Sequence, residues 1–502
     1  MRAVEPHREV VSAAPAGRDV AWPPAGAESS VARLTPAALV ALPSLTVVWT
    51  AFVAGAAVWR HQQFLSHRFD LGNMVQAVWS TVHGRPLEMT DGSSGEQIVR
   101  LAAHVDPILV LLVPFWLVHP GPETLLVVQA AALAAGVYPV VRLALVHTRS
   151  QAAALLLGAW YLAFPWIVWA AFNDFHPVVL AVPLLLYAIW FLDRDRPWAF
   201  ALCAGLALLT GELVGLTVAA LGVWCALHYG RRVRGAAIAA AGLGWTALCV
   251  AVLLPAFNEG EPSRYYGRFE SVGGSPSGLL RTLLSDPGSV LDQLGSAGDL
   301  KYVLWLLLPT ALLALGQPLL LIVALPQSLV NLLSDYTVMA LPWYHYVSAA
   351  LPALLAATIL TIGRLPRRAR PPAAGAALVA SLAVLAAATP VPGAERFIFD
   401  ELESAERRAA LQQAVALVPA GAPVTATNRV GGQLSARRVI HLFPQTRGAE
   451  WAVVDTRDPT GESGRIARLG GFRRLLRPLD REGGPWRLVF AERGVRVYRR
   501  AL

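Results

Sequence analysis

Long apolar runs, separated by short polar segments, make up most of the chain. Most of these runs approach the roughly 20 residues that an α-helix needs to cross a bilayer. The pattern predicts an all-α, polytopic membrane protein with about eleven transmembrane helices. The predicted spans are residues 37–58, 122–144, 151–171, 178–192, 197–211, 213–228, 236–256, 301–315, 318–334, 344–363 and 373–391.

Polar segments interrupt this pattern. Residues 1–36 carry Pro, Gly and mixed charges and predict a disordered cytoplasmic tail. Within a transmembrane domain that extends over 37–391, the segments 59–121 and 257–300 predict long outer loops. The apolar run at 105–118 is too short to span, so we expect an interfacial or re-entrant piece of the first outer loop.

Residues 392–502 have a different pattern and predict a small extracytoplasmic α/β domain. The segment "FDELESAERRAALQQAVALV" is typical of a helix. Short β-rich segments, separated by Gly and Pro, predict strands, and the last of them predicts a hairpin that turns near Gly494. These segments are "PVTATN", "RVIHLF", "WAVVDT" and "WRLVFAERGVRVYRR".

Arginine placement predicts the orientation. With the spans as drawn, the short loops on one side hold most of the arginines, and the positive-inside rule makes that side cytoplasmic. The chain is then a multi-pass protein of the cell (cytoplasmic) membrane, and both outer loops and the C-terminal domain lie on the outer side of that membrane. The arginines in question are Arg142, Arg149, Arg194, Arg196, those of "RRVR" at 231–234 and those of "RLPRRAR" at 364–370.

Composition agrees with a membrane protein and narrows the partners. Only 15% of the residues are charged, against about 25% in soluble domains. The net charge is +9, and residues 392–502 hold 19 Arg against 12 acidic residues, which favours a lipid surface or an anionic ligand. No nucleic-acid motif is evident. Cys203, Cys225 and Cys249 lie in apolar runs and predict buried thiols rather than disulfides or zinc ligands.

Ionisable residues from five separated segments fall on the predicted outer face. Such groups at a membrane are costly and mark functional sites. Asp70 is notable because it begins an amphipathic segment just after the first span, although Asp is also a favoured helix N-cap. The predicted site residues from these segments are Asp70, His104, Asp106, Asp174, His176, Glu212 and His345.

Several of these residues have a purely structural explanation. Asp174 and His176 in "NDFHP" fit an Asx turn before a helix, and His345 with its aromatic neighbours fits an interfacial belt. A buried Glu212 is harder to explain without a partner. The remaining charges are expected to be solvated, namely Asp91, Glu96, Arg429 and Arg437.

An ordered set of motifs resembles a prokaryotic family of polytopic membrane proteins of unknown function. The set covers roughly residues 50–460 and comprises "RFDLGNMVQAVW", "HVDPILVLLVPFW", "PGPETLLVVQAAALAAGVYPVVRLAL", "NDFHP", the "GE" hairpin, "PQSLVNLLS", "YHY", "VTATNRVGGQLSARRVIHLFP" and "WAVVD". That family is similar to the GT-C superfamily of membrane glycosyltransferases. The resemblance implies a sugar donor linked to polyprenyl phosphate. Asp70 then matches the early acid of the first outer loop, and residues 104–118 match its second surface piece.

The chain departs from better-known GT-C enzymes at two points. It has "HVDP" where many of them have a Lys-Pro-Pro type of sequence, and no second acid stands directly beside Asp70. On the resemblance, Asp70 is the general base that deprotonates an acceptor hydroxyl. The acceptor is a glycan, a lipid or a protein.

The remaining predicted site residues would bind substrate. His104, His176 and His345, followed by Tyr346, are candidates for phosphate or acceptor contacts. Arg264 and Arg268 are candidate phosphate clamps, because Arg pairs bidentately with phosphate. A divalent cation, Mg or Mn, held by Asp70, Asp106, Asp174 or His104 is an open alternative.

Two other functions remain open. A transporter of lipid-linked substrates is expected to show internal repeats and polar groups at the midplane, and neither is found here. A non-catalytic membrane scaffold or receptor, with the C-terminal domain as its binding module, predicts that the outer-face acids are individually dispensable.

Overall fold

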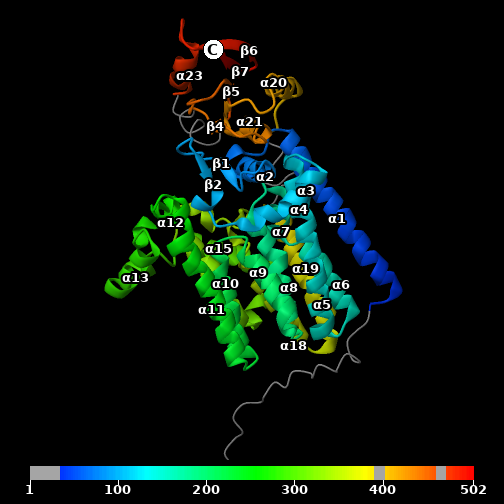
Figure 1. The fold of residues 1–502 in the computed structure, drawn as a ribbon. Helices are drawn as coiled ribbons and strands as arrows, with labels where there is room; N and C mark the ends of the chain where they lie inside the picture. The colour runs from blue at the N-terminus through cyan, green and yellow to red at the C-terminus, as the bar shows by residue number, and fades with distance from the viewer. Residues whose placement is uncertain (1–33, 389–401, 459–470, 502) are drawn as a thin grey trace, which may run out of the picture.

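The computed structural model describes residues 34–388, 402–458 and 471–501. Helices form a tall bundle, and a small sheet lies over one end of it (Figure 1). The bundle helices are α1 (Pro36–Gln62), α4 (Pro122–Ala135), α5 (Val137–Thr148), α6 (Gln151–Leu162), α7 (Pro165–Phe172), α8 (Ala181–Asp193), α9 (Pro197–Leu208), α10 (Val214–His228), α11 (Arg232–Leu248), α18 (Leu351–Arg364) and α19 (Arg370–Ala388).

Within the described residues, five helical stretches are long and apolar enough to cross a membrane, and five further apolar helices are shorter. The count of eleven spans therefore stays a prediction. The long stretches are Pro36–Gln62, Pro122–Thr148, Gln151–Phe172, Arg232–Phe257 and Arg367–Ala388. The run expected at the interface is one of the shorter helices, Pro107–Val118, formed by η4 (Pro107–Leu112) and α3 (Val113–Val118).

The spans expected at 301–315 and 318–334 are wrong as continuous helices. The chain there breaks into α15 (Ala297–Leu307), α16 (Pro318–Leu321) and α17 (Leu325–Leu332), and two 3-10 segments, η8 (Leu308–Thr310) and η9 (Leu313–Gly316), separate the first two. Proline removes a helical hydrogen bond and clashes with the preceding turn, and Pro309 and Pro318 lie at these breaks. Ala311 and Leu312 adopt left-handed conformations with φ of 50° and 61°, which a continuous helix excludes.

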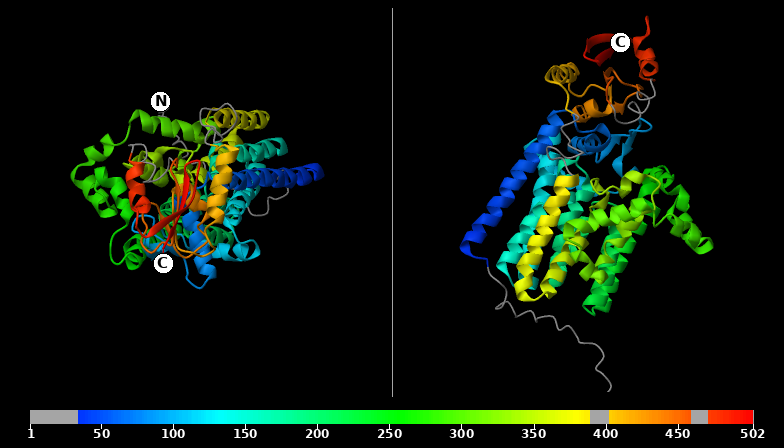
Figure 2. Two further views of the ribbon diagram at one scale, coloured as in Figure 1. Left: turned by 90° about the horizontal axis from the view of Figure 1, so that it is seen from above. Right: turned by 180° about the vertical axis from the view of Figure 1, so that it is seen from behind.

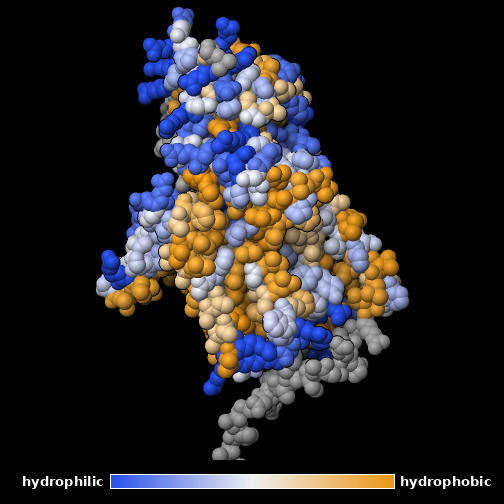
Figure 3. All heavy atoms as spheres, in the orientation of Figure 1, coloured by the Kyte–Doolittle hydropathy of each residue, from blue (hydrophilic) through white to orange (hydrophobic). Residues whose placement is uncertain are grey.

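Apolar side chains cover the outside of the bundle. On α1 many of them face outward, with Val40 and Phe52 each 68% exposed. On the face that Figure 3 shows, apolar residues cover much of the helices, with hydrophilic residues on the sheet above and at the lower end. This is the surface of a membrane protein, because a water-soluble protein rarely exposes an apolar patch of this extent.

Helices α10 and α11 approach closely because glycines line their contact. A Cβ atom at Gly222 would lie 2.4 Å from the Ala239 nitrogen, and one at Gly242 would lie 2.3 Å from the Gly215 oxygen. Small residues of this kind allow helix backbones to pack tightly within membranes. The packing fixes the α9–α10 turn, which carries Glu212.

The first outer loop folds into a compact layer at the upper end of the bundle. It contains a π-helical turn, η2 (Arg68–Gly72), then α2 (Asn73–Val82) and a hairpin of β1 (Glu88–Thr90) and β2 (Gln97–Val99). The second long loop contains the 3-10 segment η7 (Arg264–Val272), α13 (Pro276–Ser285) and α14 (Pro287–Asp292), and it follows α12 (Leu254–Phe257), which ends the long stretch Arg232–Phe257.

The C-terminal sheet has five strands in the order β4-β3-β5-β7-β6. Strands β4, β3 and β5 are parallel, and β7 runs antiparallel to β5 and β6. The predicted strands are confirmed as β3 (Val424–Ala426), β4 (Ile440–Leu442), β5 (Trp451–Asp455), β6 (Trp486–Glu492) and β7 (Val495–Arg500).

The predicted hairpin turn at Gly494 is confirmed too, with a φ of 84° that favours glycine. The helix expected over 399–418 is α20 (Ala405–Ala416), and α21 (Asn428–Gln433) and α23 (Phe472–Asp480) are additional. Seen from behind, the sheet lies directly over the first outer loop (Figure 2). Of the expected domain boundaries, the one near 392 falls among residues outside the described part, and the one at 36 coincides with the start of α1 at Pro36; the division into domains stays a prediction.

Three expected surface charges are buried. Arg429 and Arg437 are only 6% and 5% exposed, and Asp91 is 4% exposed. Arg437 donates from NH1 to the Ala422 oxygen at 2.6 Å, and Asp91 accepts from the Ser94 amide at 2.8 Å. These partners offset the cost of burial, whereas Glu96 is exposed as expected.

Candidate functional site

A cavity of about 200 Å³ lies between the first outer loop, the α9–α10 turn, η7, and α17 with the segment that follows it. Its wall contains most of the site residues expected from the sequence. Asp174 lies beside the wall and bonds to His67. The side chain of Arg264 lies outside the described part of the structure. The expected residues in the wall are Asp70, His104, Asp106, His176, Glu212, Arg268, His345 and Tyr346.

Asp70 lies in the π-helical turn η2, and its side chain is 38% exposed. Its Oδ1 atom is 3.4 Å from Nε2 of His176, and its Oδ2 atom is 3.9 Å from Nδ1 of His67. The alternative of a helix N-cap is wrong: Gly72 occupies the N-cap of α2, and no side chain caps that helix. The Asp70 carboxylate therefore does not cap a helix; it lines the cavity and faces His67 and His176.

Hydrogen bonds hold both the ring and the main chain of His176. Its Nδ1 atom is 2.8 Å from the main-chain oxygen of Asp174, and its amide donates to Gln129 at 3.0 Å. Because a carbonyl only accepts, Nδ1 must carry a proton. The other nitrogen, Nε2, faces the Asp70 carboxylate. His345 stacks on this ring at a centroid distance of 3.6 Å.

The Asx turn expected for Asp174 does not form with its side chain. The carboxylate instead accepts from the amide of His67 at 2.8 Å and lies 3.1 Å from Nδ1 of the same histidine. His67 was not predicted from the sequence, although it stands three residues before Asp70. Its partner is far away in the chain, so only the tertiary structure brings the pair together.

Mutual attraction shifts the pKa of one carboxylate and of one histidine in this cluster. Enclosure by itself raises the pKa of Asp70, but the hydrogen bond and charge of His176, with the charges of His67 and His345, hold it well below its usual range. Burial lowers the pKa of His67, and the hydrogen bond and charge of Asp174, with the charge of Asp70, outweigh it and raise that pKa. Asp70 is therefore an anion at neutral pH.

A second acid–histidine pair lines the cavity. Nδ1 of His104 lies 3.1 Å from Oε1 of Glu212, whose Oε2 atom accepts from the Val105 amide at 3.1 Å. Burial raises the pKa of Glu212, but the charge and hydrogen bond of His104 and backbone donors outweigh it and lower the pKa to about 2. This pairing satisfies the buried acid and leaves Nε2 of His104 for other contacts.

Aromatic and cationic groups continue from His104. Its ring stacks on Tyr265 at 4.4 Å. The guanidinium of Arg268 lies 4.5 Å from the Tyr265 ring centre and 4.8 Å from that of Tyr336. Contacts of this kind hold an arginine in place without consuming its hydrogen-bond donors. The cavity thus has a carboxylate with two neighbouring histidines in one part and a stacked cation in another.

Asp106 is occupied by Arg100, a residue that the sequence did not single out. Nε of Arg100 lies 3.0 and 2.9 Å from the two carboxylate oxygens, and its NH2 lies 2.6 Å from Oδ2. Both side chains are almost fully buried. A carboxylate whose two oxygens are both bonded to an arginine is a poor candidate for binding metal or substrate. We interpret this pair as a structural contact that stabilises the loop.

Among the described residues, one group has the spacing to hold a metal ion: His67, Asp70 and Asp174, whose ligand atoms lie within 4.8 Å of one another. Oxygen ligands of this kind suit Mg or Mn. Of the residues proposed for a cation from the sequence, Asp70 and Asp174 belong to this group. Asp106 and His104 are paired elsewhere.

Comparison with known proteins identifies the family and the fold to which this chain is similar. The profile of a family described as "Predicted membrane protein (DUF2079)" matches residues 60–462. A search of curated proteins finds no match. The chain is similar to the structure of ArnT from Cupriavidus metallidurans bound to undecaprenyl phosphate, with a TM-score of 0.50 and 12% identity, covering 91% of this chain and 98% of that chain.

A further similar structure is the archaeal oligosaccharyltransferase AglB from Archaeoglobus fulgidus in complex with an inhibitory peptide and a dolichol-phosphate. Its TM-score is 0.49 at 11% identity, covering 91% of this chain and 74% of that chain. The family expected from the motifs is confirmed, and the likeness to ArnT shows a GT-C-like membrane fold.

Proposed function

The chain belongs to the DUF2079 family of predicted membrane proteins, and we propose that it is an integral-membrane glycosyltransferase. It would move a sugar from a polyprenyl-phosphate donor to an acceptor on the outer membrane face. The observation that carries this proposal is the Asp70 carboxylate in a polar cavity, facing His176 at 3.4 Å at one end of an apolar helix bundle.

The fold supports the donor class by analogy. The ArnT structure that shares the fold holds undecaprenyl phosphate, a polyprenyl phosphate. A fold alone does not fix a function, so the side chains of the cavity must also suit this chemistry. A lipid phosphate needs an apolar approach, which the exposed apolar helices provide, and cations near the phosphate, which the cavity provides.

Asp70 is suited to act as the general base. In transfer, the acceptor oxygen bonds to the anomeric carbon, its proton passes to Asp70, and the bond from that carbon to the phosphate oxygen breaks. The electron pair of that bond leaves with the phosphate. A carboxylate that is already ionised can orient the acceptor hydroxyl and take its proton as positive charge develops on the sugar, and such catalysis contributes about 10²–10⁴-fold.

The departing phosphate needs positive charge, and Arg268 supplies it. His104 lines the same cavity, with its Nδ1 atom held by Glu212. Arg268 is held between Tyr265 and Tyr336, and a guanidinium binds phosphate through paired donors. Such groups, fixed before the reaction, stabilise charge that develops in the transition state.

The cluster of His67, Asp70 and Asp174 fits a divalent cation in its donor atoms and spacing. When bound there, a cation would supply positive charge for the phosphate groups of a donor. The protein's own groups have their roles without it: Asp174 fixes His67 and, through its carbonyl, His176.

Lipid co-purification tests the donor class first. The protein is purified in detergent with native lipid, and the bound lipids are identified by mass spectrometry. We expect a polyprenyl phosphate or a polyprenyl-phospho-sugar, which then serves as donor in a transfer assay with labelled sugar. If ordinary phospholipids are retained and no polyprenyl lipid is found, the transporter or scaffold functions gain support.

A further inference from the structure

The turn that carries Asp70 has an unusual backbone. Residues Arg68–Gly72 form a single π-helical turn, which is rare and is found mostly at functional sites. Its hydrogen-bond ring is wider than that of an α-helix, so it persists only where its surroundings support it. The supports here come from the C-terminal sheet region, far away in the chain.

The first support is a direct bond to the turn. The amide of Phe69, the residue before Asp70, donates to Oδ1 of Asn428 at 3.0 Å. Asn428 begins α21 and is 6% exposed. A buried amide without an acceptor is costly, so this bond fixes the backbone next to the Asp70 carboxylate.

The second support is a buried arginine. Arg68 has no exposed surface. Its NH2 group donates to the Ile440 oxygen of β4 at 3.0 Å and to the Thr90 oxygen of β1 at 2.7 Å. Its NH1 group contacts Asn73 at the start of α2. One side chain thus joins the π-helical turn, the loop hairpin and the C-terminal sheet.

The third support is close packing that only glycine permits. A Cβ atom at Gly72 would lie 2.4 Å from Oγ of Ser435. A Cβ atom at Gly431, in α21, would lie 2.7 Å from Cβ of Arg68. The backbone of each glycine therefore lies directly against a side chain of the other segment, Ser435 at one end of the turn and Arg68 at the other.

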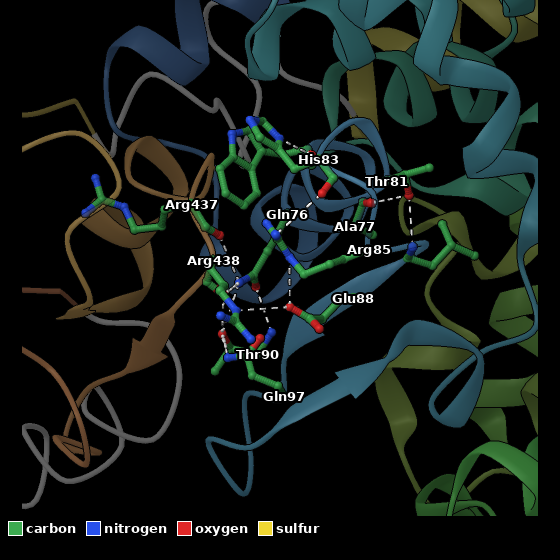
Figure 4. A network of polar contacts seen from close by, with 12 residues as sticks. Gln76, Ala77, Thr81, His83, Arg85, Glu88, Thr90, Gln97, Arg437 and Arg438 are labelled. Carbon is green, nitrogen blue, oxygen red and sulfur yellow. Dashed lines mark hydrogen bonds and ion pairs between the residues drawn. The ribbon is translucent and has the colours of Figure 1, made fainter.

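A polar network continues this contact along α2. The side-chain amide of Gln76 donates to the main-chain oxygens of Arg437 at 3.1 Å and Arg438 at 2.7 Å. Its oxygen accepts from the Thr90 amide at 2.9 Å. Figure 4 shows Gln76 at the centre of this network, between the loop hairpin and the C-terminal segment.

We infer that the C-terminal sheet region is part of the Asp70 site, and that Asn428 is a positioning residue which sets the backbone of the Asp70 turn. Asn428 does not line the cavity, so it acts through Phe69 and not on a substrate. The inference rests on the proposed function only where the rate of transfer is measured.

The kinetic test compares two replacements of Asn428. Asn428→Leu removes the acceptor for the Phe69 amide, whereas Asn428→Asp keeps an oxygen there. We expect Asn428→Leu to lower kcat about 10²-fold with little change in donor KM, as a small misplacement of a catalytic group does. Asn428→Asp should retain most of the rate. The control is Gln413→Leu, at an exposed position of α20.

Amide hydrogen exchange of the Phe69 turn gives a readout that does not depend on transfer. Asn428→Leu should speed exchange of the Phe69 amide about tenfold, as loss of one hydrogen bond predicts, and Asn428→Asp should not. If the wild-type protein transfers no sugar but these exchange rates follow the pattern, the proposed function fails and the positioning of the turn stands. Unchanged exchange in Asn428→Leu overturns the inference.

Discussion

Nε2 of His176 lies 3.4 Å from Oδ1 of Asp70, although the two residues belong to different loops at the end of the helix bundle. The ring cannot turn away, because its Nδ1 atom is bonded to the Asp174 carbonyl and His345 stacks on its face. This fixed pair keeps Asp70 ionised and aimed into the cavity, and the predictions for transfer follow from it.

Replacing Asp70 by Asn should abolish transfer while the protein remains folded and inserted. The amide keeps the shape of the side chain but cannot accept the acceptor proton, so we expect a loss of at least about 10²–10⁴-fold. The rate is measured with a labelled lipid-linked sugar, and folding is measured by thermal unfolding in detergent. Asp292→Asn, at an exposed position of α14, should be neutral. Normal transfer by Asp70→Asn would show that another group is the base.

Replacing Arg268 by Ala should weaken binding of the donor phosphate. Hydrogen bonds to charged groups contribute about 1.5–3 kcal/mol, so the donor KM should rise about 10-fold to 100-fold. The donor KM of Arg268→Lys should lie between those of the wild type and Arg268→Ala, because lysine keeps the charge but loses the paired donors. Arg281→Ala, on the exposed side of α13, is the matched control. An unchanged donor KM in Arg268→Ala would show that the donor phosphate binds in another part of the cavity.

Glu212 gives a stability that depends on pH. Its pKa is lowered to about 2 from an ordinary 4.5, so the ionised form stabilises the folded state. That contribution is complete above pH 4.5 and is lost as the pH falls toward 2. Glu212→Gln should therefore lower the free energy of unfolding by about 2 kcal/mol at pH 7. The difference in unfolding temperature between the wild type and Glu212→Gln should become smaller below pH 4.5.

Thermal unfolding of both proteins over a pH series checks this prediction. Glu96→Gln, at an exposed position, should follow the wild type throughout. A gap between Glu212→Gln and the wild type that stays constant down to pH 3 would mean that the carboxylate contributes through packing rather than through its charge.

Replacing Arg68 by Leu should destabilise the contact between the loop and the C-terminal region. The change leaves the buried Ile440 and Thr90 carbonyls without a donor, and unsatisfied buried groups cost about 1–3 kcal/mol each. We expect the free energy of unfolding to drop by about 3 kcal/mol, measured by denaturant unfolding. Arg474→Leu, exposed on α23, should change little. Equal stability of the two variants would show that the Arg68 contacts are weak.

The sequence determined the features that depend on local pattern. The apolar runs predict helices because a membrane requires helical backbone and apolar side chains over a fixed length. The strands at 424–426 and 451–455 and the turn at Gly494 were predictable because short apolar segments bounded by Gly and Pro have few other conformations. Asp70, His176 and Glu212 could be singled out because an ionisable group beside an apolar run is costly unless it has a partner.

Only the tertiary structure decided which partners these groups have. His67 pairs with Asp174 and Arg100 with Asp106, and nothing in the local sequence distinguishes them from surface charges. Arg429 and Arg437 were expected on the surface and are buried, and the Arg437 guanidinium donates to the Leu434 and Ala422 oxygens of its own domain. The predicted spans over 301–334 break at Pro309 and Pro318, since tertiary packing accommodates interruptions that hydropathy does not record. Apolar patterning acts over a few turns of one helix, whereas the pairing of buried charges is fixed by contacts between segments far apart in the chain.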